Sequence, residues 1–446
     1  FVEVLQNVLN PSSLLLILTG VVLGNIFGAI PGLNTPIAIA LVLPITMIMD
    51  PVPSVCILMG IYMGGVSGGL ISAVLLKIPG TAAAVATVFD GYPMVERGEG
   101  TRALTIGAFA SFFGGIFSSV MLLILAPLLS KIALTFGPWE YFGASILALS
   151  LVTVLAKGNM IKGCISLGIG LLACCVGQSP IDGVAYRYSF GSMYLRNGFA
   201  LVAVVIGVFA LPEIINNAAR LKEIPVVNKV EKKFFHMLDF QSIKKNIRTL
   251  LRSSVIGTVI GILPGLGGGP AALVSYAAAK KASKTPEEFG KGCIDGVFAP
   301  EVANNASIGG ALIPAIALGI PGDTATALML GGLVIHGVES GPLMFRNQPV
   351  MVYCIFVAAI FGAIFVLLGE IFGMKALPML LTVSYHYLYP AIVVLCFAGV
   401  YISSGNIFAV FASIFFTLLG IWMQFAGIPN SPFTLAFVLS TILETY

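Results

Sequence analysis

Apolar runs of membrane-spanning length recur along this chain. A helix that crosses the hydrocarbon core of a bilayer needs about 20 predominantly apolar residues. Runs that approach or exceed this length lie at 14–33, 55–76, 103–126, 138–156, 198–211, 350–369 and 405–426. Shorter or interrupted runs lie at 159–178, 305–320 and 388–402. Because a helix satisfies its own backbone hydrogen bonds in lipid, the series predicts an all-α polytopic membrane protein.

Two parts of this pattern are copies of one another. Residues 28–33 read Gly-Ala-Ile-Pro-Gly-Leu, and residues 261–266 read Gly-Ile-Leu-Pro-Gly-Leu. Downstream of each copy, a Gly-Gly pair and an apolar run lead to Ile-Pro-Gly and a polar residue, at 78–81 and at 320–323. Proline and glycine interrupt helices, so each copy carries two predicted helix breaks. Breaks in corresponding positions of two halves indicate the binding site of a secondary transporter.

The repeat also divides the chain. We expect a first repeat with its flanking spans over 1–217, a basic linker over 218–252, and a second repeat with its flanking spans over 253–446. We further expect the repeats to be inverted, so that the two sets of discontinuous helices enter from opposite faces and meet near the midplane.

The uncharged stretch 253–279 predicts a re-entrant hairpin. A single crossing would separate the linker from the lysine cluster that follows, which consists of Lys280, Lys281, Lys284 and Lys291. A break at 264–270 instead leaves two half-helices, each rising about 15 Å, or half the hydrocarbon thickness. Non-helical backbone at that depth needs protein or water around it. The uncharged stretch 14–49, with a break at 31–36, is expected to fold in the same way.

Composition excludes a soluble domain, because 58% of the residues are hydrophobic and only 9% are charged, against about a quarter charged in soluble domains. Nine basic and three acidic residues lie between 218 and 252, which predicts a cytoplasmic linker near lipid and not a nucleic-acid site. The first apolar run leads directly into further membrane sequence, so we interpret it as a span and not as a removed signal. The seven cysteines show no metal-ligand spacing, and we expect no metal or organic cofactor.

The breaks supply the candidate chemistry. Free backbone amides at the N-termini of half-helices attract anions, and polar side chains beside them can orient a carboxylate. The predicted substrate-binding residues lie at the breaks or in the polar sequence between them: Pro31, Gly32, Asn34, Thr35, Gly80, Thr81, Pro264, Gly265, Gly267, Gly268, Asn304, Asn305, Gly322, Asp323 and Thr324. Lys77, beside one break, is either an anion partner or a lysine that reaches for the membrane surface.

Three acidic residues are candidates for binding a coupling ion, either Na⁺ or a proton. Glu301 lies in the polar sequence 295–307, which leads into an apolar run, and an ionisable residue at membrane depth is costly unless it has a function. The alternative is a loop with helix-capping asparagines. Asp323 and Asp90 are the other candidates, although the sequence around Asp90 also fits a turn.

Several motifs in order resemble those of the large membrane subunit of the tripartite tricarboxylate transporters, the TctA-like family. They are the segments 28–33, 77–81, 87–93, 289–292, 299–306 and 318–322. The resemblance implies a multi-pass protein of the bacterial inner membrane that imports citrate-like or other carboxylates by symport with an ion. It also implies two partners, a small membrane subunit and a periplasmic solute-binding protein. One departure is Asp295, where the family pattern has glutamate.

Two other classes of function remain as alternatives. Residues 65–68 read Gly-Val-Ser-Gly, a pattern of intramembrane serine proteases in which His336 or His386 would supply the base. Broken helices also line ion channels. The repeat has no explanation in a protease, and we therefore favour a non-enzymatic transporter that works by alternating access.

Overall fold

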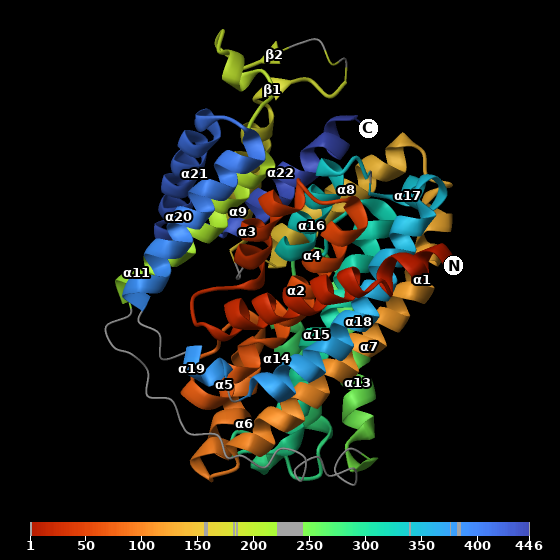
Figure 1. The fold of residues 1–446 in the computed structure, drawn as a ribbon, viewed down its shortest axis with the longest axis vertical. Helices are drawn as coiled ribbons and strands as arrows, with labels where there is room; N and C mark the ends of the chain where they lie inside the picture. Colours follow the sequence, from red (N-terminus) through yellow and green to blue (C-terminus); the bar gives the residue numbers. More distant parts are fainter. Residues whose placement is uncertain are drawn as a thin grey trace.

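The structure is a computed structural model that describes residues 2–155, 159–181, 183, 186–220, 244–338, 340–374, 376–380 and 385–445 (Figure 1). The predicted linker lies largely outside the described residues, at 221–243. The described chain is helical except for one antiparallel pair of short strands, β1 (Gly177–Gln178) and β2 (Tyr186–Arg187), in which Gly177 pairs with Arg187. This confirms the predicted all-α fold class, with the small hairpin as an unpredicted addition.

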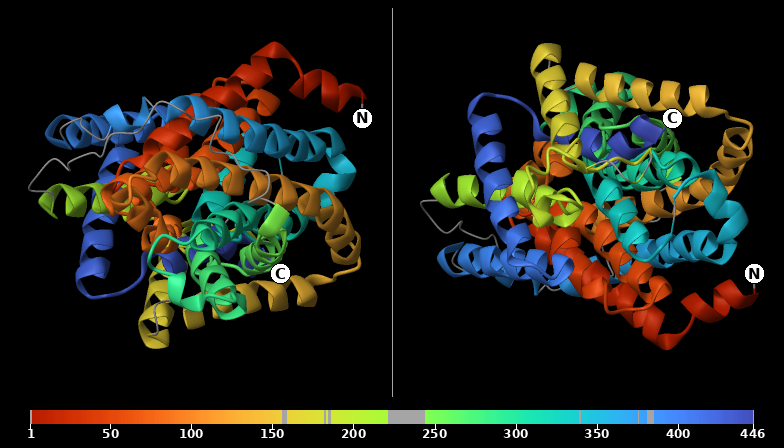
Figure 2. Two further views of the ribbon diagram at one scale, coloured as in Figure 1. Left: turned by 90° about the horizontal axis from the view of Figure 1, so that it is seen from below. Right: turned by 90° about the horizontal axis from the view of Figure 1, so that it is seen from above.

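The first part of the chain forms a series of helices that ends in one long helix. These elements are α1 (Val2–Val8), α2 (Pro11–Ala29), α3 (Thr35–Thr46), α4 (Pro51–Ser67), α5 (Gly69–Leu76), the 3-10 turn η1 (Ala82–Ala84), α6 (Val85–Glu96) and α7 (Gly100–Ala133). In both end-on views α1 lies at the rim of the bundle (Figure 2).

The middle of the chain contains the strands and the helices around them. These helices are α8 (Pro138–Leu155), α9 (Met160–Cys174), the 3-10 turn η2 (Met193–Leu195), α10 (Leu201–Val205), the π-helical segment η3 (Ile206–Ala210) and α11 (Leu211–Arg220). The strands lie at one end of the molecule, whereas α6 and α13 reach the other (Figure 1).

The last part of the chain begins with the second set of interrupted helices. Its elements are α13 (Ile247–Ile262), α14 (Gly268–Ala282), the 3-10 turn η4 (Pro286–Glu288), α15 (Ile294–Leu318), α16 (Thr324–Ile335), α17 (Pro342–Asn347), α18 (Pro349–Gly373), α19 (Leu377–Leu380), α20 (Tyr385–Ser404), α21 (Ile407–Phe425) and α22 (Asn430–Thr445).

Helices are interrupted where the Pro-Gly motifs predicted, between α2 and α3, after α5, between α13 and α14, and between α15 and α16. The stretch 253–279 does form two helices, but they are longer than the predicted ten residues, with 16 in α13 and 15 in α14. The extra turns carry charged residues such as Arg248 and Lys281 at the far ends from the break. Charged side chains suit those ends because they are the ends nearest to water.

Some described helices are long and apolar enough to cross a bilayer. They are Pro11–Ala29, Pro51–Leu76 (α4 with α5), Gly100–Ala133, Pro349–Gly373 and Ile407–Phe425. Large apolar side chains lie exposed on the outer surface, among them Leu15 (62%), Leu147 (61%) and Phe411 (63%). Such a surface suits lipid and not water, so the protein is a membrane protein. By contrast, the predicted run 198–211 is divided among α10, η3 and the start of α11.

Glycine rows bring the interrupted helices close together. Gly20, Gly24 and Gly28 of α2 face Gly60 and Gly64 of α4 and its C-cap Gly68 so closely that a methyl group on either side would meet the backbone of the other. Close approach through small residues is the usual way in which membrane helices pack. Because these rows end at the breaks, they fix where the non-helical segments lie.

Candidate functional site

The two breaks of the second copy touch each other. Between α13 and α14 the backbone turns through Gly265 (φ 81°) and Gly267 (φ 60°), a region that favours glycine. The N–H of Gly265 donates to the carbonyl of Gly322 over 2.7 Å. A methyl group built on Gly267 would lie 3.5 Å from Cβ of Asp323. The start of α14 and the start of α16 therefore lie side by side.

In the first copy, the second break packs against the end of α2, just before the first break. Gly32 also has a positive φ of 91°, and Gly80 packs so tightly on the carbonyl oxygen of Gly28 that no side chain fits between them. Asn34 caps α3 by accepting a hydrogen bond from the N–H of Ile37 over 3.1 Å. The carbonyl of Pro31 accepts a hydrogen bond of 3.1 Å from the hydroxyl of Tyr389, so this end of the break faces α20.

Equivalent glycines make equivalent contacts in the two copies. In each copy a methyl group added to one of three glycines would collide with a particular carbonyl oxygen. In the first copy these pairs are Gly24 with Ile61, Gly28 with Gly65, and Gly80 with Gly28. In the second copy they are Gly257 with Ala303, Gly261 with Ser307, and Gly322 with Gly261. Aligning the Pro-Gly motif at 31–32 with that at 264–265, and the Ile-Pro-Gly motif at 78–80 with that at 320–322, places each pair of the first list opposite its counterpart in the second.

The two copies meet where α14 begins. A methyl group on Gly268 would lie 3.2 Å from Cβ of Ala83, and one on Gly269 would lie 3.2 Å from the carbonyl oxygen of Ala82. Ala82 and Ala83 belong to η1, directly after the second break of the first copy. Three breaks thus converge on one region: the break after α5, the break before α14 and the break before α16. Asn34 and Thr35, at the start of α3, lie beside this region and do not contact these three breaks in the contacts described. Thr35 contacts Gly65 of α4.

Asn304 occupies the centre of this region. It lies in the middle of α15 and is fully buried, and a methyl group on Gly268 would collide with its Oδ1. Its Nδ2 donates to the carbonyl of Val66 over 3.4 Å, but its Oδ1 has no hydrogen-bond partner among the described residues. Oγ1 of Thr81 is likewise buried without a partner in the described part of the chain. Unpartnered buried polar atoms are rare and call for a ligand or water.

Asn305 differs from its neighbour because both ends of its amide are engaged. Its Oδ1 accepts a hydrogen bond of 2.6 Å from the hydroxyl of Ser67, and its Nδ2 donates to the backbone carbonyl of Glu301 over 3.1 Å. The asparagines lie inside a 25-residue helix, so the alternative of a loop with capping asparagines is wrong. Asn305 ties α15 to α4, which favours a structural contribution.

Asp323 and Thr324 begin α16. The carboxylate of Asp323 accepts hydrogen bonds from the N–H and the hydroxyl of Thr326, at 2.8 and 2.9 Å, and completes a capping box. Its second oxygen accepts a hydrogen bond of 2.6 Å from the hydroxyl of Tyr62 on α4. Asp323 is therefore held in place beside Gly267 by both halves of the protein.

Glu301 lies fully buried on α15, one turn from Asn304 and Asn305. Its carboxylate accepts hydrogen bonds from the hydroxyls of Thr87 on α6, at 2.5 Å, and Ser111 on α7, at 3.3 Å. Within the described chain no basic residue pairs with it. The predicted role of Glu301 in ion coupling stays a prediction, and its burial is compatible with it.

Asp90 is in α6 and not in a turn. Its carboxylate accepts hydrogen bonds from the N–H groups of Gly290, Gly292 and Cys293 and from the hydroxyl of Tyr276, at distances of 2.7 to 3.0 Å. These donors hold the loop before α15 against α6. The contacts favour a structural role, while ion coupling by Asp90 stays a prediction.

Sequence reasoning missed Glu370. This residue is 1% exposed in α18, and neither of its carboxyl oxygens has a partner among the described residues. The apolar run predicted at 350–369 ends one residue before it, although α18 continues to Gly373. An acidic residue inside an otherwise apolar membrane helix was the available signal.

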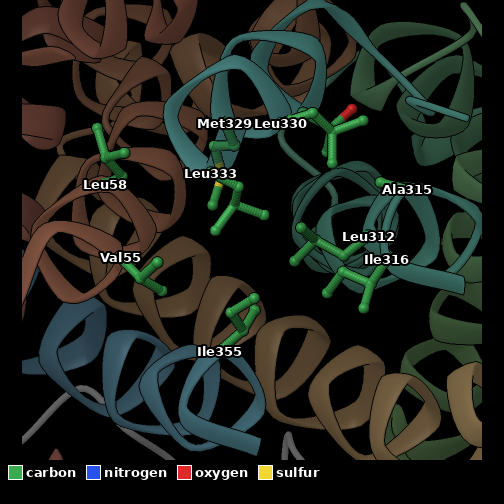
Figure 3. A pocket seen from close by; sticks show the side chains of 10 residues that line it. Val55, Leu58, Leu312, Ala315, Ile316, Met329, Leu330, Leu333 and Ile355 are labelled. Atoms are coloured by element: carbon green, nitrogen blue, oxygen red, sulfur yellow. The ribbon is translucent and has the colours of Figure 1, made fainter. Parts of the chain in front are cut away.

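Two cavities lie beside this convergence and not at its centre. The smaller, of about 10 Å³, is lined mainly by apolar side chains from α4, α15, α16 and α18, including Leu58, Leu312 and Met329, and also by Thr326 (Figure 3). Its volume suits about one water molecule, so it is too small for a carboxylate solute. The larger, of about 910 Å³, lies between α9–α10 and α16, and its lining includes Gly319, Leu330 and Gly331.

Lys77 and the serine motif do not contribute chemistry to the convergence. The ammonium group of Lys77 lies 4.9 Å from the ring centroid of Tyr92, a cation–π contact that keeps it beside α6. The hydroxyl of Ser67 donates to Asn305, as described above, and His386 is exposed on α20. The geometry therefore gives the protease alternative no observed serine–histidine pair.

Comparison with known proteins places the chain in a family. A protein of Agrobacterium vitis from the TAR-I ttuC' 3' region, with a mass of 52.8 kDa, is 36% identical over 442 residues, which cover 99% of this chain and 87% of the relative. A second Agrobacterium vitis protein, from the TAR-II ttuC' 3' region, is 35% identical over 190 residues, or 43% of this chain and 78% of the relative. No solved structure matches. The model of the tripartite tricarboxylate transporter TctA family matches residues 14–435, and this chain therefore belongs to that family.

Proposed function

We propose that this chain is the subunit that carries a carboxylate across the bacterial inner membrane, with its solute site where the helix breaks converge. The solute would lie between the N-terminus of α14, Asn304 and Thr81, with Asp323 at one side. The observation that carries the proposal is the pair of buried polar atoms without partners, Oδ1 of Asn304 and Oγ1 of Thr81, beside the tip of an interrupted helix.

The donors at this place fit a carboxylate. The first N–H groups of α14 lack intrahelical partners, and a helix of 15 residues adds the favourable potential of its N-terminus. An amide side chain offers donors and an acceptor, and a threonine hydroxyl offers both. Such a set can bind the oxygens of a carboxylate and a hydroxyl group next to it. No arginine or lysine is needed to hold the anion.

The same geometry favours coupling to a cation. Asp323 places a negative charge beside the tip of α14, and a carboxylate solute would be repelled by it at a few ångströms. A co-transported cation, Na⁺ or a proton, would remove this repulsion. The position of Asp323 thus supports our proposal that an ion gradient drives transport.

Alternating access would use the two copies as structural repeats. The matching glycine contacts in the two halves support this assignment, because each contact sets the position of a break in the same way. At 12 residues each, α3, α6 and α16 would rise about 18 Å, less than the hydrocarbon thickness. Short helices of this kind support re-entrant segments, and we propose that the repeats are inverted.

The large cavity beside α16 offers a route to the site. Its lining reaches Gly319, four residues before Asp323, and it extends toward Gln178 at the strand end of the molecule. We propose that solute enters there after delivery by a periplasmic solute-binding protein, with a small membrane subunit as the third component. A channel is the alternative function: solute would follow the same route but would not be coupled to an ion gradient. The uptake experiment below distinguishes a channel from a transporter.

Uptake of radiolabelled citrate tests the proposal. The chain would be produced in bacterial cells together with the two proposed partner subunits, and cells without the chain would give the background uptake. Accumulation above the external concentration that stops when ion gradients are dissipated supports a coupled transporter. Equilibration without accumulation would support a channel, and no uptake of citrate or of a panel of di- and tricarboxylates would contradict the proposal.

A further inference from the structure

A second buried carboxyl group lies near Glu301, outside the solute site. Glu370 of α18 is 1% exposed, and both of its oxygens lack hydrogen-bond partners among the described residues. Glu301 of α15 is fully buried as well, and α7 packs against both α15 and α18. The two side chains therefore have to be considered together.

Helix α7 brings the two residues near one another. At Gly114 a methyl group would collide with the carbonyl of Val302, the residue after Glu301, and at Gly115 it would lie 3.0 Å from Cβ of Ala363 on α18. Ser111, one turn earlier on α7, donates to Glu301 over 3.3 Å. Glu370 lies two turns beyond Ala363 on α18, which packs along the same stretch of α7 (Figure 1).

No cation balances the pair within the described chain. The elements packed against α15 and α18 carry these titratable or charged groups: Glu3, Cys56, Tyr62, Asp90, Tyr92, Glu96, Arg102, Lys131, Arg248, Arg252, Tyr276, Lys280, Lys281, Asp295, Asp323, Arg346, Tyr353 and Cys354. None of them forms a hydrogen bond or ion pair with Glu301 or Glu370 among the interactions of the described residues. Arg102, the basic residue nearest the start of α7, pairs with Glu99 over 3.2 Å.

Elementary electrostatics limits what such a pair can be. An ionised carboxylate without partners in a low-dielectric interior is strongly disfavoured, and two neighbouring carboxylates oppose each other's ionisation. Thr87 and Ser111 donate to Glu301 and stabilise a negative charge there, whereas Glu370 has no donor. We therefore expect Glu370 to be protonated, and the pair to carry at most one negative charge, on Glu301.

We propose that Glu370 and Glu301 form a proton-binding carboxyl pair that exchanges a proton with the solution during the transport cycle. The pair is distinct from the solute site but connected with it, because the backbone carbonyl of Glu301 accepts from Asn305, the neighbour of Asn304. A change of charge on Glu301 acts on the helix segment that holds Asn304. This inference deepens the proposed function by making the proton a coupling ion and by adding Glu370 to the coupling residues.

The test that needs no substrate is an infrared titration of the purified full chain in liposomes. In the wild type we expect a carboxylic acid C=O stretching band that disappears as a single titration step, and we expect Glu370→Gln to remove that band. Glu140→Gln is the matched control, because Glu140 is exposed on α8, and it should leave the band unchanged. A wild type without a buried carboxylic acid band, or a band that survives in Glu370→Gln, would overturn the pair.

The coupling itself is tested with citrate in liposomes that also contain the small membrane subunit and are supplied with the solute-binding protein. In the wild type a pH gradient should stimulate uptake, and in Glu370→Gln that stimulation should be lost while exchange of internal for external citrate persists. Stimulation that persists in the variant, or a loss of sodium stimulation in place of pH stimulation, would contradict the inference. If the wild type takes up neither citrate nor any carboxylate of the panel, the proposed function fails, but the infrared result still decides whether the proton site exists.

Discussion

Replacing Asn304 by leucine tests whether this residue binds the solute or only stabilises the fold. The change keeps the size of the side chain and removes the only buried amide at the centre of the convergence whose oxygen lacks a partner in the described structure. It also removes the hydrogen bond to the carbonyl of Val66, which at 3.4 Å is long. We expect uptake to fall steeply while the folded protein stays stable.

The expected changes in stability and in citrate affinity can be estimated from these contacts. Loss of a hydrogen bond of this kind costs about 0.5–1.5 kcal/mol, and removing an unpartnered buried polar atom returns about 1–3 kcal/mol, so the variant should be as stable as the wild type or more stable. A hydrogen bond to a charged solute contributes roughly 1.5–3 kcal/mol. Because about 1.4 kcal/mol corresponds to a factor of ten, citrate affinity should fall roughly 10- to 150-fold.

Asn305→Leu is the matched control. Both ends of its amide are engaged, by Ser67 and by the backbone of Glu301, so this change should destabilise the protein by about 2 kcal/mol or more. The measurements are equilibrium binding of radiolabelled citrate and thermal unfolding in detergent. If Asn304→Leu destabilised the protein as much as Asn305→Leu and kept wild-type affinity, the reasoning about the site would be refuted.

Three further predictions follow from neighbouring contacts. Gly268→Ala would place a methyl group against the amide oxygen of Asn304, so citrate binding should be lost. Gly143→Ala is the control, because its methyl group would meet nothing within 4 Å, and it should bind citrate normally. Equal citrate binding by the two variants would contradict the proposed site. Asp90→Ala leaves the donors of its loop unsatisfied and should lower the free energy of unfolding by about 3 kcal/mol or more, as measured by denaturant unfolding; an unchanged stability with lost ion dependence would instead support a coupling role. Cysteines placed at Lys245 and Lys281 in a cysteine-free background should react with a membrane-impermeant thiol reagent from the same side, and labelling from opposite sides would exclude the re-entrant hairpin.

The sequence predicted the interruptions because their cause is local. A proline removes a backbone donor and a glycine accepts a positive φ, so Pro264 with Gly265 marks a break whatever surrounds it. The partners of each break are not local. Nothing in the sequence near Gly268 indicates that it packs against Asn304 and Ala83, since these contacts depend on how α14, α15 and η1 meet.

The misjudged acidic residues have the same explanation. The residues after Asp90 fit a turn, but Asp90 lies within a helix, and backbone N–H groups 200 or more residues further along the chain bind its carboxylate. Glu370 stands at the end of a predicted apolar run, and only the packing of α18 on α7 shows that it is buried. Only the tertiary contacts therefore show which carboxyl groups stabilise the fold and which lack a hydrogen-bond partner among the described residues.

The central claim is that a carboxylate binds between the tip of α14, Asn304 and Thr81. Its most direct test is an experimental structure of the full chain determined with citrate bound. We predict citrate density within hydrogen-bonding distance of the first N–H groups of α14, with contacts to the amide of Asn304 and the hydroxyl of Thr81. Citrate found in the large cavity beside α16, with the helix tips still packed on one another, would contradict the account.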